Sequence, residues 1–283
     1  MRASVGRLVK AGFVAALGLT AVLGLPRVGV AQASLDIDKA VLLDAESTAN
    51  ISTEEVRSAL ETVSPLVFDV RPFREYAISH IPGAISVAPK PGTSREEYMS
   101  DIAEIGRLVA DDKTAPMILY CAGPHCGKSK RVAADLVEAG YSNVRRYQLG
   151  IPVWRALGGV TEIEVEGVQH VAKKDQTAVI IDARDSDQFE RESLPGAQNI
   201  PRSRIDPGTF DPEYRAWTHP GGEEVKAAKA DGRLPMEDHN TRIIVFGDSA
   251  EAAREVAEAL ARNGFHNVSF CNANYEALKT ALR

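Results

Sequence analysis

Residues 117–131, MILYCAGPHCGKSKR, decide the fold of this chain, because they join a short apolar run to a helix through a loop that begins with a cysteine. The run at 117–120 predicts a buried strand, and Gly123 and Pro124 end it. Apolar residues then recur at helical spacing over the following turns. We therefore expect the cysteine at the carboxyl end of a strand, close to the N-terminus of a helix.

Cys121 is the cysteine at this position, and the position favours thiol chemistry. The N-terminus of a helix presents backbone N–H groups without helical partners and a partial positive charge. Both shift a nearby thiol toward thiolate, its nucleophilic form, and loop amides also bind anions. We predict Cys121 as the catalytic residue. The predicted substrate- or anion-binding loop comprises Ala122, Gly123, Pro124, His125, Gly127, Lys128 and Ser129.

Cys126 follows five residues after Cys121, and its role is open. It is a second reactive thiol that forms a disulfide with Cys121, or a loop residue without chemistry. The third cysteine, Cys271, follows an apolar run and is expected in the core. Three cysteines are too few for a disulfide scaffold.

The second half of the chain repeats the first. Two motifs recur 113 residues later and a third 126 residues later, which places an insertion of 13 residues between residues 201 and 240. The repeated segments are LVFDVR at 66–71 and VIIDAR at 179–184, IPGA at 81–84 and LPGA at 194–197, and MILY at 117–120 and IIVF at 243–246. Gly247 aligns with Cys121, so the second unit lacks the nucleophile.

Strands alternate with helices in both units, which predicts an α/β fold with two parallel, doubly wound sheets covered by helices on both faces. Ligands of such sheets bind at the carboxyl ends of the strands, where Cys121 is expected. The predicted organisation is a signal peptide at 1–33, a linker or arm at 34–50, a domain with the cysteine at 51–160 and a domain without it at 161–283.

Residues 1–33 have the order of a secretory signal peptide, with basic residues, an uncharged apolar run and a small-residue pattern that predicts cleavage near Ala33. The apolar run is shorter than the roughly 20 residues of a membrane span. We therefore expect a periplasmic or secreted protein without a stable membrane span. The formal charge is −6, and it falls to −10 when the four basic residues of 1–33 are removed, which argues against nucleic acid as a partner.

Several of these motifs together resemble the rhodanese (thiosulfate sulfurtransferase) family in its tandem two-domain form. The motifs in the first unit are Asp69-Val70-Arg71, His80-Ile81-Pro82-Gly83-Ala84, Tyr120-Cys121 before a loop and helix, and Leu149-Gly150 followed by Trp154. The second unit matches at Asp182-Ala183-Arg184 and Leu194-Pro195-Gly196-Ala197. The resemblance covers nearly all of the chain after residue 33.

The resemblance implies a sulfurtransferase that moves sulfane sulfur from a donor such as thiosulfate to a thiophilic acceptor through a persulfide on Cys121. The implied partners are a small sulfur-donor anion and a thiol or cyanide-like acceptor, with a protein as a further candidate acceptor. Asp69 and Arg71 resemble the buried pair that supports the loop from below. A persulfide on Cys121 leaves two further roles open for Cys126, which either attacks that persulfide or accepts relayed sulfur. No cofactor and no metal are expected, because only Cys121, His125 and Cys126 offer neighbouring ligands.

Two functions of other classes remain open. A thiol-disulfide redox or sensing module is favoured by the closeness of Cys121 and Cys126 in an oxidising compartment. A non-catalytic rhodanese-like binding protein is favoured by the missing nucleophile of the second unit. Phosphate ester hydrolysis is disfavoured, because Gly127 stands where rhodanese-like phosphatases need arginine. Nucleotide binding is disfavoured, because the loop is one residue short of P-loop spacing.

Overall fold

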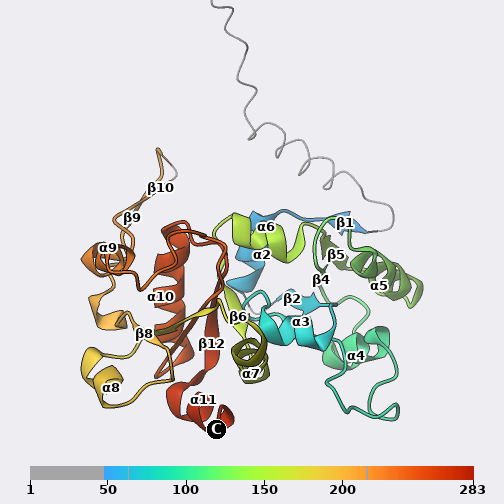
Figure 1. The fold of residues 1–283 in the computed structure, drawn as a ribbon. Helices are drawn as coiled ribbons and strands as arrows, with labels where there is room; N and C mark the ends of the chain where they lie inside the picture. Colours follow the sequence, from blue (N-terminus) through green and yellow to red (C-terminus); the bar gives the residue numbers. More distant parts are fainter. Residues whose placement is uncertain (1–47, 63, 215) are drawn as a thin grey trace, which may run out of the picture.

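The chain forms two α/β domains that lie side by side (Figure 1). This computed structural model describes residues 48–62, 64–214 and 216–283. The predicted signal peptide and nearly all of the predicted arm lie outside these residues. Within the described part, no helix combines the length and the apolar character needed to cross a lipid bilayer.

The first domain is a five-stranded, all-parallel sheet in the order β1-β5-β4-β2-β3, with helices between the strands. Its elements are β1 (Ala49–Asn50), α2 (Thr53–Leu60), β2 (Leu66–Asp69), α3 (Phe73–Ile78), β3 (Ile85–Ser86), α4 (Asp101–Leu108), β4 (Met117–Tyr120), α5 (Gly127–Glu138), β5 (Val144–Tyr147) and α6 (Gly150–Ala156). The end of the predicted arm is therefore an edge strand.

The second domain repeats this topology in the order β6-β12-β11-β7-β8, again with all strands parallel, so the predicted duplicated fold is confirmed. Its elements are β6 (Thr161–Ile163), α7 (Val165–Lys174), β7 (Val179–Asp182), α8 (Ser186–Arg191), β8 (Gln198–Asn199), η1 (Arg202–Arg204), β9 (Thr209–Asp211), β10 (Ala216–Thr218), α9 (Gly222–Ala230), β11 (Ile243–Gly247), α10 (Ala250–Arg262), β12 (Val268–Asn274) and α11 (Tyr275–Ala281). The antiparallel β9–β10 hairpin lies in the predicted insertion and projects from the domain (Figure 1).

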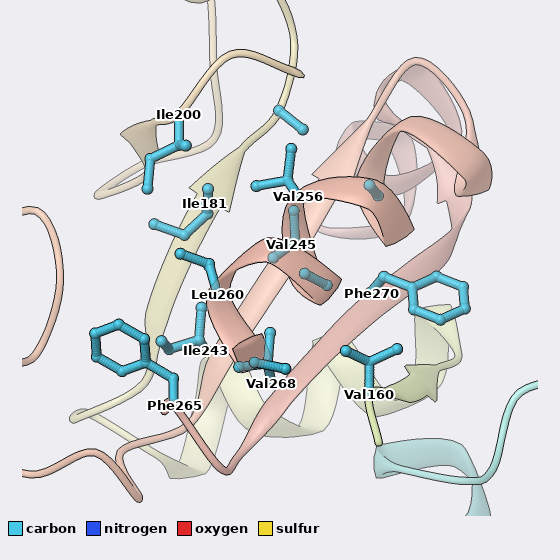
Figure 2. Close-up of a cluster of buried hydrophobic side chains, with 14 of the residues drawn as sticks. Val160, Ile181, Ile200, Ile243, Val245, Val256, Leu260, Phe265, Val268 and Phe270 are labelled. Carbon is cyan, nitrogen blue, oxygen red and sulfur yellow. The ribbon is translucent and has the colours of Figure 1, made fainter. Parts of the chain in front are cut away.

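Each sheet separates two apolar cores, because successive side chains of a strand point to opposite faces. On the central strand β4, Met117 and Leu119 pack with α4 and α5, whereas Ile118 and Tyr120 pack with α2 and α6. The second domain has the same arrangement. Figure 2 shows one of its cores, in which β11 and β12 pack against α10.

Local sequence signals set several helix starts. Ser52 and Glu55 form the capping box at the start of α2, as their spacing indicates. Ser94 and Glu97 close only a turn, and α4 begins at Asp101, after the side chain of Ser100 accepts a hydrogen bond from the Ala103 amide. The Ser100 cap directly precedes Ile102 and Ile105, which reach the core.

The two domains contact each other through α3 and α7. Gly167 permits this approach, because a Cβ atom at its position would lie 2.0 Å from the backbone oxygen of Ala77. Beside this contact, His80 and Glu162 exchange two backbone hydrogen bonds of 3.0 and 2.8 Å, and the Glu164 amide donates to Ala77. Backbone hydrogen bonds as well as helix packing therefore hold the two domains together.

Candidate active site

Cys121 follows the last residue of β4 and begins the loop to α5, as the sequence predicts. It continues the alternation of Met117 and Leu119, so its side chain joins the apolar core beneath α5 and is 4 % exposed. Its sulfur is bonded to Cys126, with a Cα–Cα distance of 6.1 Å. Of the roles left open for Cys126, the structure contains the disulfide. Thiol chemistry at Cys121 therefore requires reduction of this bond.

The other residues of the predicted loop differ in exposure. Ala122, His125 and Gly127 are exposed, Pro124 and Lys128 are partly buried, and Gly123 and Ser129 are buried. Cys126 is the N-cap residue of α5 but makes no side-chain capping bond. The exposed residues form the outer side of the loop, and the buried ones form its inner side.

Gln148, one residue after β5, holds the inner side of this loop. Its Nε2 donates to the carbonyl oxygens of Pro124 at 2.9 Å and Cys126 at 3.1 Å. The C=O and N–H groups of a trans peptide point in opposite directions. The N–H groups of His125 and Gly127 therefore point away from Gln148, toward the outer side of the loop. This orientation leaves amides available to a ligand approaching from outside.

A buried polar network keeps Gln148 in place. Its Oε1 accepts hydrogen bonds from Ser129 Oγ at 3.1 Å and Arg146 Nη1 at 3.2 Å. Arg146 Nε in turn donates to Thr48 Oγ1 at 2.7 Å. Because Gln148 and Arg146 are almost fully buried, each polar atom of this network needs its partner.

The sequence prediction did not include Arg146 and Gln148. The available signal was the pair Arg145 and Arg146 in the middle of β5. An arginine that is buried in a strand needs polar partners in the core. The equivalent strands β5 and β12 begin at Val144 and Val268, and this offset of 124 residues places Phe270 and Asn272 opposite Arg146 and Gln148. The domain without the cysteine therefore lacks this arginine, and the network accompanies the cysteine loop.

Gly150 lets α6 approach the cysteine loop. Its φ is +64°, and a Cβ atom there would lie 2.4 Å from the Cys121 carbonyl oxygen and 2.7 Å from the Gly123 nitrogen. Both are backbone atoms, which cannot rotate away as a side chain can. The loop is consequently supported by Gln148 on one side and by the start of α6 on another.

Lys128, predicted to attract anionic donors, forms an ion pair with Asp101. Its Nζ lies 3.0 Å from Asp101 Oδ2, and the lysine side chain is 30 % exposed. The pair joins the first turns of α5 and α4. The positive charge of Lys128 is thus balanced within the domain.

Asp69 and Arg71, predicted to support the cysteine loop from below, form a buried ion pair at the end of β2. Arg71 Nε donates to Asp69 Oδ1 at 3.0 Å, and Arg71 Nη2 donates to the Ser79 carbonyl oxygen at 2.6 Å, so the pair joins the end of β2 to the turn after α3. Burial opposes the charge of Arg71, but the hydrogen bonds and charge of Asp69 outweigh it and raise the pKa of the guanidinium. The pair also lies beside Tyr120, the residue before Cys121: the Arg71 guanidinium carbon is 5.7 Å from the centre of the Tyr120 ring, and the Val70 amide donates to the Tyr120 carbonyl oxygen.

The second domain repeats this ion pair without a cysteine. Arg184 Nε donates to Asp182 Oδ1 at 3.0 Å, and Arg184 Nη2 donates to the Glu192 carbonyl oxygen at 2.7 Å. This ion pair is present even in the domain that has Gly247 in place of the cysteine. We therefore attribute it to the fold of both domains rather than to the reaction of one.

A cleft of about 1050 Å³ is lined by residues of both domains. Trp154 contributes to its wall from the first domain, and Phe210, Trp217 and Arg254 contribute from the second. Residues of the cysteine loop do not line it. Among the described residues, one group of metal-ligating side chains lies together, at the domain boundary rather than in this loop: His80, Glu162 and Glu164.

Sequence comparison agrees with the duplicated fold. The rhodanese-like domain matches residues 52–157 and again residues 168–281. The chain therefore belongs to the rhodanese-like family, in a tandem two-domain form. The first matched segment contains Cys121, and the second has Gly247 at the corresponding position.

Solved structures resemble the chain at low identity. A thiosulfate sulfurtransferase from Pseudomonas aeruginosa is 20% identical over 82% of this chain and 42% of its own, with a TM-score of 0.33. An anaerobic ergothioneine biosynthesis enzyme from Chlorobium limicola is 19% identical over 83% of this chain and 61% of its own, also with a TM-score of 0.33. The chain spans less than two thirds of either protein. No match was found among curated protein sequences.

Proposed function

We propose that the protein is a sulfurtransferase in which Cys121 carries sulfane sulfur as a persulfide. The observation that carries the proposal is the placement of Cys121, at the carboxyl end of the central strand of a rhodanese-like domain and before the first turn of α5. The outward N–H groups of His125 and Gly127 support it, because an anionic donor and a persulfide anion both need hydrogen-bond donors.

The transfer proceeds in two displacements. The Cys121 thiolate attacks the outer sulfur of a donor such as thiosulfate, the S–S bond of the donor breaks, and sulfite leaves with the electron pair. A thiophilic acceptor, either a thiolate or cyanide, then attacks the outer sulfur of the persulfide. Cys121 leaves as thiolate and is ready for the next donor. A protein thiol is a further acceptor class for the same step.

Cys126 gives the persulfide a second outcome. If the Cys126 thiolate attacks the Cys121 sulfur, a disulfide forms and hydrosulfide leaves with the electron pair. The disulfide in the structure corresponds to the product of this step. A dithiol reductant is then needed to restore both thiols, so we expect turnover to depend on reductant in the wild type.

Turnover of thiosulfate with cyanide tests the proposal. We expect activity in the reduced wild type, none in Cys121→Ser, and activity with little dependence on reductant in Cys126→Ser, because that variant forms no internal disulfide. Cys271→Ser is the matched control, since this buried cysteine lies outside the loop. Mass spectrometry of reduced Cys126→Ser after thiosulfate should show one added sulfur, because this variant has no second thiol in the loop to displace it. Turnover in Cys121→Ser, or no added sulfur on Cys126→Ser, would contradict the proposal.

A thiol-disulfide module is the second candidate function, and the Cys121–Cys126 bond is the observation that favours it. Exchange with a protein disulfide requires both cysteines, one to attack and one to resolve. Sulfur transfer requires only Cys121. If Cys126→Ser loses every activity of the wild type, exchange is the function, whereas sulfur transfer that persists in this variant excludes that reading.

We further propose that the protein is exported, on the pattern of residues 1–33 alone. A periplasmic or extracellular location is oxidising, and this supports formation of the disulfide. The N-terminal sequence of protein recovered from the periplasm or medium tests the proposal. A mature chain that begins near Ser34 is expected, and an intact N-terminus in the cytosol would contradict it.

A further inference from the structure

His80 is a buried histidine at the domain boundary whose orientation is fixed from one side. Its Nδ1 lies 2.9 Å from the carbonyl oxygen of Tyr76, and its ring stacks on that of Tyr76 with centroids 3.8 Å apart. A carbonyl oxygen accepts a hydrogen bond, so Nδ1 carries the proton. In the neutral ring, Nε2 is then left with a lone pair. The side chain is 1 % exposed.

Two carboxylates of the second domain face this Nε2. Glu162 lies on β6 and Glu164 follows it, so the two side chains point to the same side of the extended segment. The Nε2 atom is 3.7 Å from Glu162 Oε2 and 3.9 Å from Glu164 Oε1. The other oxygen of Glu164 accepts a hydrogen bond of 2.9 Å from Asn272 Nδ2.

These distances are too long for hydrogen bonds and close to those between ligands of one metal ion. An N–H···O hydrogen bond is about 2.7–3.2 Å long. Zinc bonds to imidazole nitrogen and carboxylate oxygen are about 2.0–2.2 Å, so two ligands at a tetrahedral angle lie roughly 3.3–3.6 Å apart. The three ligand atoms of the cluster lie within 4.8 Å of one another. A movement of a few tenths of an ångström would bring Nε2 and each of the two carboxylate oxygens to the spacing of ligands on one ion.

The surroundings match those of a metal-binding histidine. Histidine ligands usually donate their other N–H to a backbone carbonyl or a carboxylate, and ligating carboxylates are themselves hydrogen-bonded. Tyr76 and Asn272 supply these two contacts here. The paired backbone hydrogen bonds between His80 and Glu162 hold the two domains together at the point where the ligands converge.

We propose that His80, Glu162 and Glu164 bind a divalent transition metal of the zinc class and that the ion joins the two domains. One nitrogen and two carboxylate oxygens suit zinc or manganese better than magnesium or calcium, which take oxygen ligands only. Glu162 also lines the cleft between the domains, so a fourth position on the ion is open to water or an anion from the cleft.

The site is separate from the chemistry proposed for Cys121 and goes beyond it. The metal was not expected from the sequence, because the motif containing His80 and the two glutamates belong to different domains. Coordination would neutralise two neighbouring carboxylates and add a link between the domains. Binding to the native state alone also stabilises it.

Titration calorimetry with zinc chloride tests the proposal on the full chain, without an affinity tag, in the oxidised form and after dialysis against a chelator. The disulfide excludes Cys121 and Cys126 as zinc ligands, and Cys271 is buried. We expect one zinc ion per chain and an increase in the thermal unfolding midpoint with added zinc. Glu164→Gln should bind zinc at least about tenfold more weakly than the wild type. Its unfolding midpoint should therefore rise less at the same zinc concentration.

Glu164→Gln keeps the size of the side chain and an acceptor for Asn272, so its fold should be preserved. Glu166→Gln is the matched control, because Glu166 is exposed and lies outside the cluster, and it should bind zinc like the wild type. His80→Phe keeps the ring against Tyr76 but removes the ligand, and it should lose binding. The proposal is overturned if the wild type shows no saturable zinc binding, as an ion pair alone would give. It is also overturned if Glu164→Gln binds zinc as tightly as the wild type.

Discussion

Gly150 is glycine for two reasons: its backbone is left-handed, and the cysteine loop leaves no space for a side chain. Substitution by alanine, compared with the same substitution at Gly158, separates the two. Gly150 has a φ of +64°, and the added Cβ atom would lie 2.4 Å from the Cys121 carbonyl oxygen. It would also lie 2.7 Å from the Gly123 nitrogen and 2.9 Å from the Gly123 Cα. All three are backbone atoms of the loop, so the loop itself has to move.

The cost has two parts. Placing alanine in the left-handed region costs about 1–2 kcal/mol. Forcing extra volume into a packed region typically costs about 1–3 kcal/mol more. We therefore expect Gly150→Ala to lower the free energy of unfolding by roughly 2–5 kcal/mol. Displacement of the carbonyl of Cys121 should also reduce thiosulfate turnover by about ten- to a hundredfold, because small misplacements of reacting groups have large effects on rate.

Urea unfolding of Gly150→Ala and Gly158→Ala gives the comparison. Gly158 has a φ of +79° and no atom within 4 Å of an added Cβ, so its substitution reports the backbone cost alone, about 1–2 kcal/mol. Turnover should stay at the wild-type level in Gly158→Ala. If the two variants lose equal stability and both keep full turnover, the close contact with the cysteine loop is not what requires glycine at 150.

Three further outcomes are expected. Gln148→Leu should lower turnover and cost about 1–3 kcal/mol of stability, because partly buried carbonyl groups of the loop lose their donor. Wild-type turnover in this variant would show that these hydrogen bonds do not shape the loop. Asp69→Asn and Asp182→Asn should each lower the free energy of unfolding in urea by about 3–5 kcal/mol, because each leaves a buried arginine unpaired. If Asp69→Asn instead loses turnover but keeps its stability, Asp69 has a role in the reaction. Burial raises the pKa of Cys271 from 9.0 to about 11, so the folded state keeps a proton that the unfolded state releases. Stability should therefore fall between pH 9 and 11, by up to about 3 kcal/mol. Cys271→Ala should lack this component, and an identical pH profile for this variant and the wild type would contradict the assignment.

The sequence determined the architecture of both domains, because the signals for it are local. Alternation of apolar runs with helical periodicity specifies which segments are strands and helices, and the constant offset between LVFDVR and VIIDAR reveals the duplication. The position of Cys121 followed from the same signals, since a strand, a glycine-proline break and a helix start are contiguous in the chain.

The tertiary structure decided the contacts made by those segments. Pairing of Cys121 with Cys126 depends on the path of the loop, and the support from Gln148 depends on the neighbouring strand β5. The approach of His80 to Glu162 depends on how two separately folded domains pack. Local patterns specify secondary structure, whereas the partner of a buried polar group is set by segments far away in the chain, and only the folded molecule brings them to hydrogen-bonding or coordination distance.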